Sequence, residues 1–247
     1  MARAPWERMG PSLLSMEWRD LLFAHYPVAP ERLRARLPER VSVDTYEGQA
    51  WLGVVALTMG DVRPRFAPFG RTFPQVNLRT YVTIDGDPGV YFLSMDADDR
   101  LAVTAGRRAL GVPYFVADTS LSRRGAEVRF ESERTHAGAA DATFRATYGP
   151  DGTPDPVRSG TLEEFAIDRY RFYLPGRDAI YTGVLDHDPW TLRTASVTVD
   201  ENTLFAASDI GRPAAEPRCH VAPAKAVTLG DIGRRAEAEP RQEPVRI

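Results

Sequence analysis

Short stretches rich in β-branched and aromatic residues recur along the whole chain and favour a mainly β fold. The clearest hairpin joins Gln75–Ile84 to Val90–Asp96 through the turn sequence Asp-Gly-Asp-Pro-Gly. A second hairpin is expected between Val41–Tyr46 and Ala50–Met59, around Glu47-Gly48-Gln49. Further strands are predicted at Tyr114–Ala117, Ala126–Glu133, Ala142–Tyr148, Ala179–Val184, Leu192–Val199 and His220–Leu229.

Helical signals are few and short. Pro30–Leu37 starts with proline at a first-turn position, and Asp98–Leu110 stops at a glycine. Thr161-Leu162-Glu163-Glu164 has the form of a capping box. Many strands with few helices predict a mainly β (α+β) fold, an antiparallel barrel or sandwich with a few short peripheral helices.

The organisation along the chain is that of one domain. We expect it to cover residues 16–233, with loose termini at residues 1–15 and 234–247, because the ends differ from the rest in composition. No polar linker divides the interior of the chain. Gly149–Gly160 is rich in proline and glycine and is predicted to be a surface loop.

Composition argues against several classes of partner. The net charge of −3 and a pI of about 5.9 give no attraction for nucleic acid or an anionic membrane. No apolar run approaches the ~18 residues that cross a bilayer. Cys219 is the only cysteine, and the first 20 residues do not resemble a signal peptide, so a cytoplasmic protein is expected. The composition is compatible with a homo-oligomer as well as a monomer.

The sequence gives no positive signal for a metal or a cofactor. The four histidines, among them His187 between two aspartates, do not pair at metal-ligand spacings. Phosphate-binding loops, dinucleotide fingerprints and nucleophile elbows do not occur. We therefore expect neither a metal nor a cofactor.

Gln75–Ile84 alternates between apolar and polar side chains. Its polar face consists of Gln75, Asn77, Arg79, Tyr81 and Thr83. One interpretation is a half-buried strand with its polar side in water. The other directs an amide, an amide, a guanidinium and a phenol into a barrel interior, where they converge on a ligand. Periodicity alone leaves both open.

Seven stretches of the chain, in order, resemble one family. They are Trp18–Val28, Ala50–Met59, Phe73–Val82, Gly89–Ala97, Gly106–Ala117, Glu164–Tyr173 and His187–Leu192. The pattern resembles the YqjF-like family of unknown function, a branch of the acetoacetate decarboxylase-like superfamily. The resemblance implies a cone-shaped antiparallel β barrel with an internal cavity, and it favours the inward orientation of the polar face.

Two departures from the superfamily pattern affect the chemistry. The decarboxylases place a Schiff-base lysine directly after a Gly-x-Pro sequence, where this chain has Tyr114 and Phe115. Lys225 is the only lysine and lies far along the chain, so a decarboxylation that needs an amine nucleophile is improbable. Gln75 stands where the resemblance implies a glutamate, and an amide cannot transfer protons near neutral pH.

Three classes of function remain as hypotheses. The first is an enzyme of lyase, dehydratase or cyclase type that acts on a keto-acid or polyketide-like carbonyl compound without a Schiff base. Arg79, Tyr81 and Tyr114 are its candidate catalytic residues; Gln75, Asn77, Arg107 and His25 are candidate substrate-binding residues. The second is a non-catalytic binding or sensing domain that keeps the cavity. The third is an interaction protein whose interior is filled by side chains.

Overall fold

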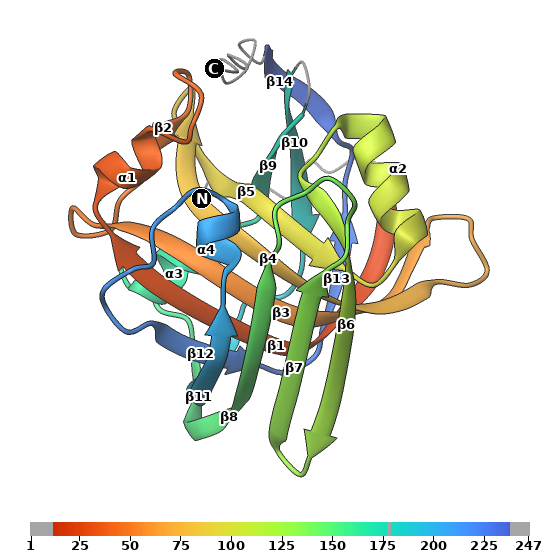
Figure 1. Ribbon diagram of the computed structural model, residues 1–247, viewed down its shortest axis with the longest axis vertical. Coiled ribbons are helices and arrows are strands. Elements are labelled where there is room, and N and C mark those ends of the chain that lie inside the picture. Colours follow the sequence, from red (N-terminus) through yellow and green to blue (C-terminus); the bar gives the residue numbers. More distant parts are fainter. Residues whose placement is uncertain (1–11, 177–178, 238–247) are drawn as a thin grey trace.

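The computed structural model describes residues 12–176 and 179–237, and all strands in this part belong to one sheet (Figure 1). The helices are α1 (Pro30–Arg34), α2 (Arg100–Leu110), α3 (Leu162–Ala166) and α4 (Leu204–Ala207). The strands are β1 (Leu14–Val28), β2 (Ser42–Val43), β3 (Ala50–Pro64), β4 (Arg71–Ile84), β5 (Asp87–Ala97), β6 (Tyr114–Arg124), β7 (Glu127–Arg134), β8 (Thr143–Pro156), β9 (Arg171–Pro175), β10 (Ala179–Asp186), β11 (Thr191–Asn202), β12 (Arg218–Ala222), β13 (Lys225–Leu229) and β14 (Gly233–Glu237).

The sheet closes on itself because β1 and β5 each pair with three other strands. One ring runs β1-β12-β11-β8-β7-β6-β5-β4-β3, and a second runs β1-β13-β10-β9-β5-β4-β3. The two rings share β1, β3, β4 and β5, which we call the shared wall. The expectation of a mainly β fold with a few short peripheral helices is confirmed.

The shared wall is buried on both faces, and a separate apolar core covers each face. Leu22, Ala24 and Leu52 face the first core, together with residues of β7, β8 and α4. Phe23 and Val55 face the second core, together with α3, β9, β13 and Trp190. Burial on both faces explains why Leu21–Val28 of β1 and Ala50–Met59 of β3 have nearly continuous apolar sequences.

Strand pairing differs from the sequence-based expectation in two places. β5 pairs in parallel with β6, because α2 forms a crossover that returns the chain in the same direction, and β5 also pairs in parallel with β9 on its other side. The expected hairpin between residues 41–46 and 50–59 is limited to a tight turn at Tyr46–Gln49. Both edges of β3 are hydrogen-bonded to β1 and β4, so β2 pairs with β4 instead.

Three element boundaries also differ. The segment expected as one strand over His220–Leu229 is divided at Pro223 into β12 and β13, which pair with successive parts of β1. The segment Gly149–Gly160, predicted to be a surface loop, is largely exposed as expected, but it is strand as far as Pro156, because β8 continues along β11. Residues 234–237, expected to be loose, pair with β10, whereas residues 1–11 and 238–247 lie outside the described part of the chain.

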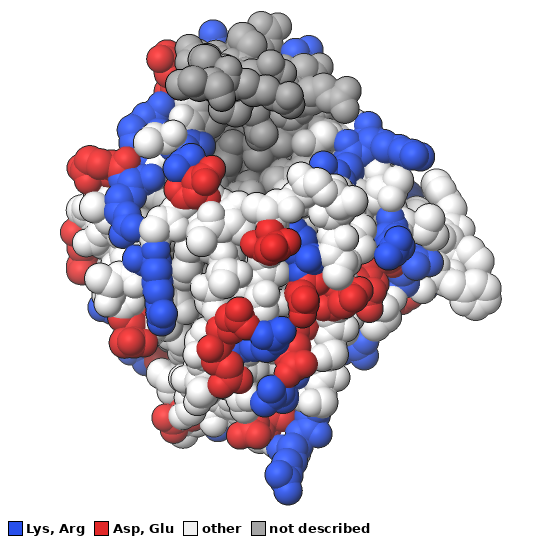
Figure 2. Space-filling model, in the orientation of Figure 1, with Lys and Arg blue, Asp and Glu red and all other residues white. Residues whose placement is uncertain are grey.

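The surface carries both signs of charge and one exposed apolar loop. Figure 2 shows acidic and basic side chains interspersed over the face in view. The β3–β4 loop, at the right of Figure 1, exposes Phe66 and Phe69. Within residues 12–176 and 179–237, no helix has both the length and the apolar character needed to cross a bilayer.

Candidate functional site

The polar face of β4 is turned into the protein, towards the second core. Gln75, Asn77, Arg79 and Tyr81 are 7%, 5%, 8% and 0% exposed. Because β4 is part of the shared wall, its other face is buried by Val76 and Leu78 in the first core. We call these four side chains, together with the buried His25 of β1, the inner polar cluster.

Gly53 of β3 is what allows the inner polar cluster to come together. The sheet register places His25, Gly53 and Arg79 side by side on neighbouring strands. A Cβ atom on Gly53 would lie 3.0 Å from the Tyr81 hydroxyl and 3.2 Å from Nε of Arg79. The missing side chain therefore leaves the space above β3 to groups from β1 and β4.

Replacing Gly53 by alanine is expected to destabilise the protein by about 1–3 kcal/mol, because the added methyl group overpacks Tyr81 and Arg79. Urea denaturation measures the free energy of unfolding. Gly149→Ala in β8 is the matched control, because its Cβ would meet no atom closer than 3.6 Å. Equal stabilities of the two variants would contradict the tight packing at Gly53.

Arg79 is a buried cation without a carboxylate partner in the described part of the chain. Its Nη2 donates a hydrogen bond of 3.1 Å to the carbonyl oxygen of Ala166 in α3. Its guanidinium carbon lies 5.7 Å from the ring centre of Phe23 and 5.9 Å from that of Tyr81. A buried charge without a counter-charge is costly, so this environment favours an anion beside Arg79.

Several buried polar atoms around Arg79 have no hydrogen-bond partner among residues 12–176 and 179–237. Within the inner polar cluster they are Nε of Arg79, the Tyr81 hydroxyl, Oδ1 of Asn77 and Nε2 of His25. The indole N–H of Trp190 is also without a partner, and its ring packs edge-on against Phe23 at 5.5 Å. Three of these groups can donate a hydrogen bond: the Nε–H of Arg79, the Tyr81 hydroxyl and the Trp190 indole N–H. Such a set suits a ligand rich in acceptor oxygens.

Burial keeps the two titratable members of the cluster uncharged. The pKa of His25 is held well below its usual value by burial, then by Arg79 and His220. Burial raises the pKa of Tyr81, against the opposing effect of Arg79 and Arg169. At neutral pH the cluster thus contains a neutral imidazole and a protonated phenol next to one guanidinium.

Stability is expected to fall as the pH drops below about 6.5, because the pKa values of all four histidines are lowered in the folded chain. Unfolded imidazoles bind protons in this range and the buried ones do not. His25 alone contributes a slope of up to about 1.4 kcal/mol per pH unit. Urea denaturation between pH 7.5 and 5 should give a shallower slope for His25→Gln, and identical slopes would contradict the burial of His25.

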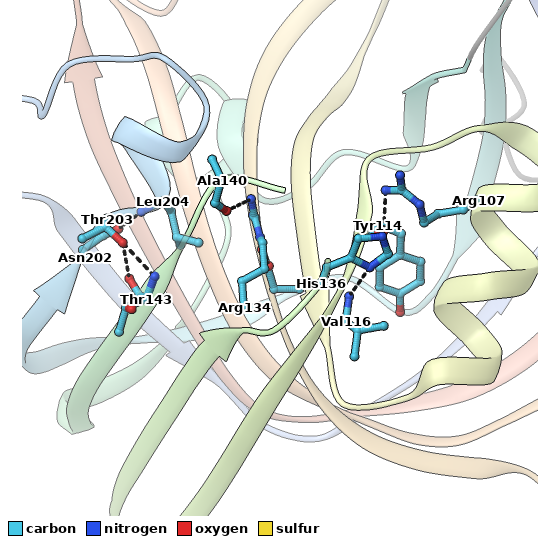
Figure 3. Close-up of polar contacts among 11 residues, drawn as sticks. Arg107, Tyr114, Val116, Arg134, His136, Ala140, Thr143, Asn202, Thr203 and Leu204 are labelled. Carbon is cyan, nitrogen blue, oxygen red and sulfur yellow. Dashed lines mark hydrogen bonds and ion pairs between the residues drawn. The ribbon is translucent and has the colours of Figure 1, made fainter. Parts of the chain in front are cut away.

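Tyr114 reaches the cluster through Gln75, and Arg107 does not reach it. The Tyr114 hydroxyl donates to Oε1 of Gln75 at 2.6 Å. Arg107 of α2 instead donates to the backbone carbonyl of Tyr114 at 3.0 Å, on the side away from the phenol ring (Figure 3). Nearby, the backbone N–H of Val116 donates to Nδ1 of His136. Arg107 therefore supports the backbone that positions Tyr114.

Lys225 lies at the sheet surface next to the second core. Its ammonium group donates to the carbonyl oxygen of Pro189 at 3.0 Å and lies 5.1 Å from the ring centre of Trp190. Lys225 pairs with Trp18 at the β1–β13 ladder, whereas His25 lies at the other end of β1. The only amine side chain of the protein is thus engaged outside the inner polar cluster.

A surface pocket of about 520 Å³ adjoins the cluster across two side chains. Phe165 and Arg169 line this pocket, and both also contact Tyr81, at 5.1 Å between ring centres and 5.5 Å from the guanidinium carbon. Arg169 is fixed by an ion pair of 2.7 Å with Asp44. Phe165 and Arg169 therefore form a wall between the surface pocket and the cluster.

Sequence reasoning missed three contributors to the site. Gly53 carried a usable signal, because a glycine inside an apolar strand indicates close approach of neighbouring groups. Trp190 contributes an indole N–H from the second core, and Ala166 contributes through its backbone, which no side-chain pattern reveals. Among the described residues, no group of three or more His, Cys, Asp and Glu is arranged to hold a metal ion.

Solved structures share this architecture. Acetoacetate decarboxylase from Legionella pneumophila superposes with a TM-score of 0.63 at 17% identity, over 96% of this chain and 93% of that one. The enduracididine biosynthesis enzyme MppR complexed with pyruvate superposes with a TM-score of 0.62 at 14% identity, over 92% and 91%. The fold is therefore that of the acetoacetate decarboxylase-like proteins.

Sequence comparison is more specific. The model of the DUF2071 family of uncharacterized conserved proteins matches residues 15–226, so the chain belongs to this family. The uncharacterized protein YqjF of Bacillus subtilis (strain 168) is 38% identical over 213 residues, which cover 85% of this chain and 87% of YqjF. The resemblance inferred from seven stretches of sequence is thus confirmed.

Proposed function

We propose that the protein binds a small oxo acid or related carbonyl compound in the inner polar cluster and acts on it without a Schiff base. Arg79 holds the carboxylate, and the Tyr81 hydroxyl donates a hydrogen bond to the carbonyl oxygen. Donors fixed around a carbonyl stabilise the enolate that lyase, dehydratase and cyclase reactions share. The observation that carries the proposal is the buried guanidinium of Arg79, which has an unpartnered Nε and no ion pair within the described residues.

The surrounding donors favour an acceptor-rich ligand. The Tyr81 hydroxyl and the Trp190 indole have no hydrogen-bond partner in the described part of the chain, and both residues lie in the second core with Phe23. A carboxylate next to a carbonyl offers several acceptor oxygens in a small volume. The structural relative MppR is complexed with pyruvate, which has this chemistry.

The test is a calorimetric titration with pairs of ligands that differ in one group. Pyruvate and acetoacetate are expected to bind. Acetone and ethyl pyruvate lack the free carboxylate and should bind at least about tenfold more weakly, since a hydrogen bond to a charged group is worth ~1.5–3 kcal/mol. Equal binding of pyruvate and its ester would contradict the role of Arg79. No binding of any oxo acid would defeat the proposal.

Treatment with pyruvate or acetoacetate and sodium borohydride is expected to leave the mass of the protein unchanged. Imine formation needs a free amine with a lowered pKa. Lys225, the only lysine, is bonded to the Pro189 carbonyl outside the cluster. Mass spectrometry of the intact protein and its peptides measures the outcome; a reduced adduct at Lys225 would overturn the mechanism without a Schiff base.

A non-catalytic binding or sensing domain is the second candidate. The hydrogen bond of 2.6 Å between Tyr114 and Gln75 favours it, because this contact joins two unreactive groups at positions where the superfamily resemblance implies reactive ones. Proton NMR of pyruvate in D₂O separates the candidates. Loss of the methyl signal on binding indicates enolisation, whereas binding with a constant methyl signal indicates a sensor.

A further inference from the structure

The inner polar cluster adjoins a second histidine on the side where β1 pairs with β12. His220 of β12 lies opposite Phe23 of β1, and His25 lies two residues further along β1. The two imidazoles are therefore diagonal neighbours on one face of an antiparallel pair. Side chains in this relation lie ~7–8 Å apart at the backbone, within reach of each other's rings.

His220 forms a carboxylate–imidazole pair with Glu163 of α3. Oε1 of Glu163 lies 3.5 Å from Nε2 of His220. Nδ1, on the opposite side of the ring, is buried and has no hydrogen-bond partner among the residues that the structure describes. A proton on Nε2 therefore faces the carboxylate and leaves Nδ1 as a proton acceptor, as when a carboxylate orients an imidazole base.

Glu163 and His220 also line a surface pocket of about 610 Å³, so solvent reaches the pair from outside. Asp155, Arg158 and Thr194 border the same pocket. Helix α3 connects the two regions, since Glu163 contacts His220 and the Ala166 carbonyl contacts Arg79. The pair thus lies between the solvent and the inner polar cluster.

We propose that Glu163 and His220 form a proton-transfer arm that connects His25 with solvent; the inference rests on the proposed function. A proton leaves the carbon next to the ligand's carbonyl and moves to His25, and the electron pair moves to the oxygen held by the Tyr81 hydroxyl. Because Nε2 of His25 and Nδ1 of His220 are not hydrogen-bonded to each other, the proton passes between the two rings through one water molecule. His220 then releases its Nε2 proton towards Glu163 and solvent. Reversal returns a solvent proton to carbon, so one carbon-bound hydrogen is exchanged for one from water.

Burial, helped by nearby arginines, keeps both imidazoles in the neutral form that accepts protons. Burial lowers the pKa of His220, and Arg218 of the same strand adds to this while Glu163 opposes it. Arg79 faces His25 from β4, and Asp155 and Arg158 face the pocket from β8 and the segment after it. Glu163 is the carboxylate that lies next to the His220 ring and stabilises a transient imidazolium.

The first test is the exchange of the pyruvate methyl protons in D₂O, followed by proton NMR. His220→Gly is expected to slow the exchange at least tenfold while pyruvate affinity stays within twofold of the wild type. Added imidazole should restore the rate in the variant and leave the wild type unchanged, because the open pocket admits it to the position of the lost ring. An unchanged rate in His220→Gly, or a slow rate that imidazole does not raise, would overturn the arm.

The second test needs no ligand. In protein labelled with ¹⁵N-histidine, exchange of the His25 ring N–H with water should slow at least tenfold in His220→Phe, with backbone amide protection unchanged. Equal exchange in His220→Phe and the wild type would refute the arm. Failure of the wild type to bind oxo acids contradicts the proposed function instead, and the His25 exchange rate still decides whether the arm exists.

Discussion

Arg79→Met is expected to weaken the binding of pyruvate about 100-fold, ~2.8 kcal/mol, while changing the free energy of unfolding of the ligand-free protein by less than about 1.5 kcal/mol. The guanidinium has no carboxylate partner within the described residues and makes one hydrogen bond, to the Ala166 carbonyl. Methionine has a similar length to arginine and carries no charge. The substitution therefore lowers the affinity for pyruvate while the free energy of unfolding changes little. Calorimetric titration and urea denaturation measure the two quantities.

A control at a different arginine separates the local effect from a change in total charge. Arg129 lies on β7 at the protein surface and pairs with Glu131 at 2.8 Å. Arg129→Met removes the same charge and should leave pyruvate affinity within twofold of the wild type. If Arg79→Met binds pyruvate as well as Arg129→Met does, the carboxylate site is not at Arg79.

Arg134→Met is expected to destabilise the protein by about 3–5 kcal/mol, the cost of breaking a buried ion pair by removing one partner. Arg134 of β7 holds Asp96 of β5 through two hydrogen bonds of 2.5 and 2.8 Å, and both side chains are nearly inaccessible. Its guanidinium also stacks 3.9 Å above the ring centre of Phe115. Urea denaturation should show this loss directly.

The double variant Asp96→Leu/Arg134→Met tests the cause of that loss. It removes both charges, so it should recover at least half of the destabilisation seen in Arg134→Met. A double variant as unstable as the single one would show that packing around Phe115, and not the unpaired carboxylate, is responsible. Arg134 and Arg79 thus differ in their ion pairing: Arg134 is paired with Asp96, whereas Arg79 has no carboxylate partner in the part of the chain that the structure describes.

The sequence predicted the strand that carries the site because its alternation is a local property. Gln75, Asn77, Arg79 and Tyr81 share a face by the geometry of any strand. Which way that face points depends on what covers it, and the nearly continuous apolar sequence of β3 was the available indication that both faces are buried. The β4–β5 hairpin and the helix that ends at Gly111 were predicted for the same local reasons.

The remaining features depend on competition between distant segments. β2 pairs with β4 because β3 already has two neighbouring strands. The sequence of residues 41–46 does not indicate this choice of partner. Arg107 lies on α2 as expected, yet the start of β6 determines that it contacts the backbone of Tyr114. Glu163 and His220 meet only because β12 pairs with β1 and α3 covers the second core.

The most direct test of the central claim observes the Nε–H group of Arg79 by NMR in protein labelled at arginine Nε. The signal is assigned by its absence from the spectrum of Arg79→Lys. It should be protected from solvent exchange, and its chemical shift should change progressively as pyruvate is added, with saturation at one equivalent per chain. A resonance that stays constant while pyruvate binds would place the carboxylate elsewhere and contradict the account.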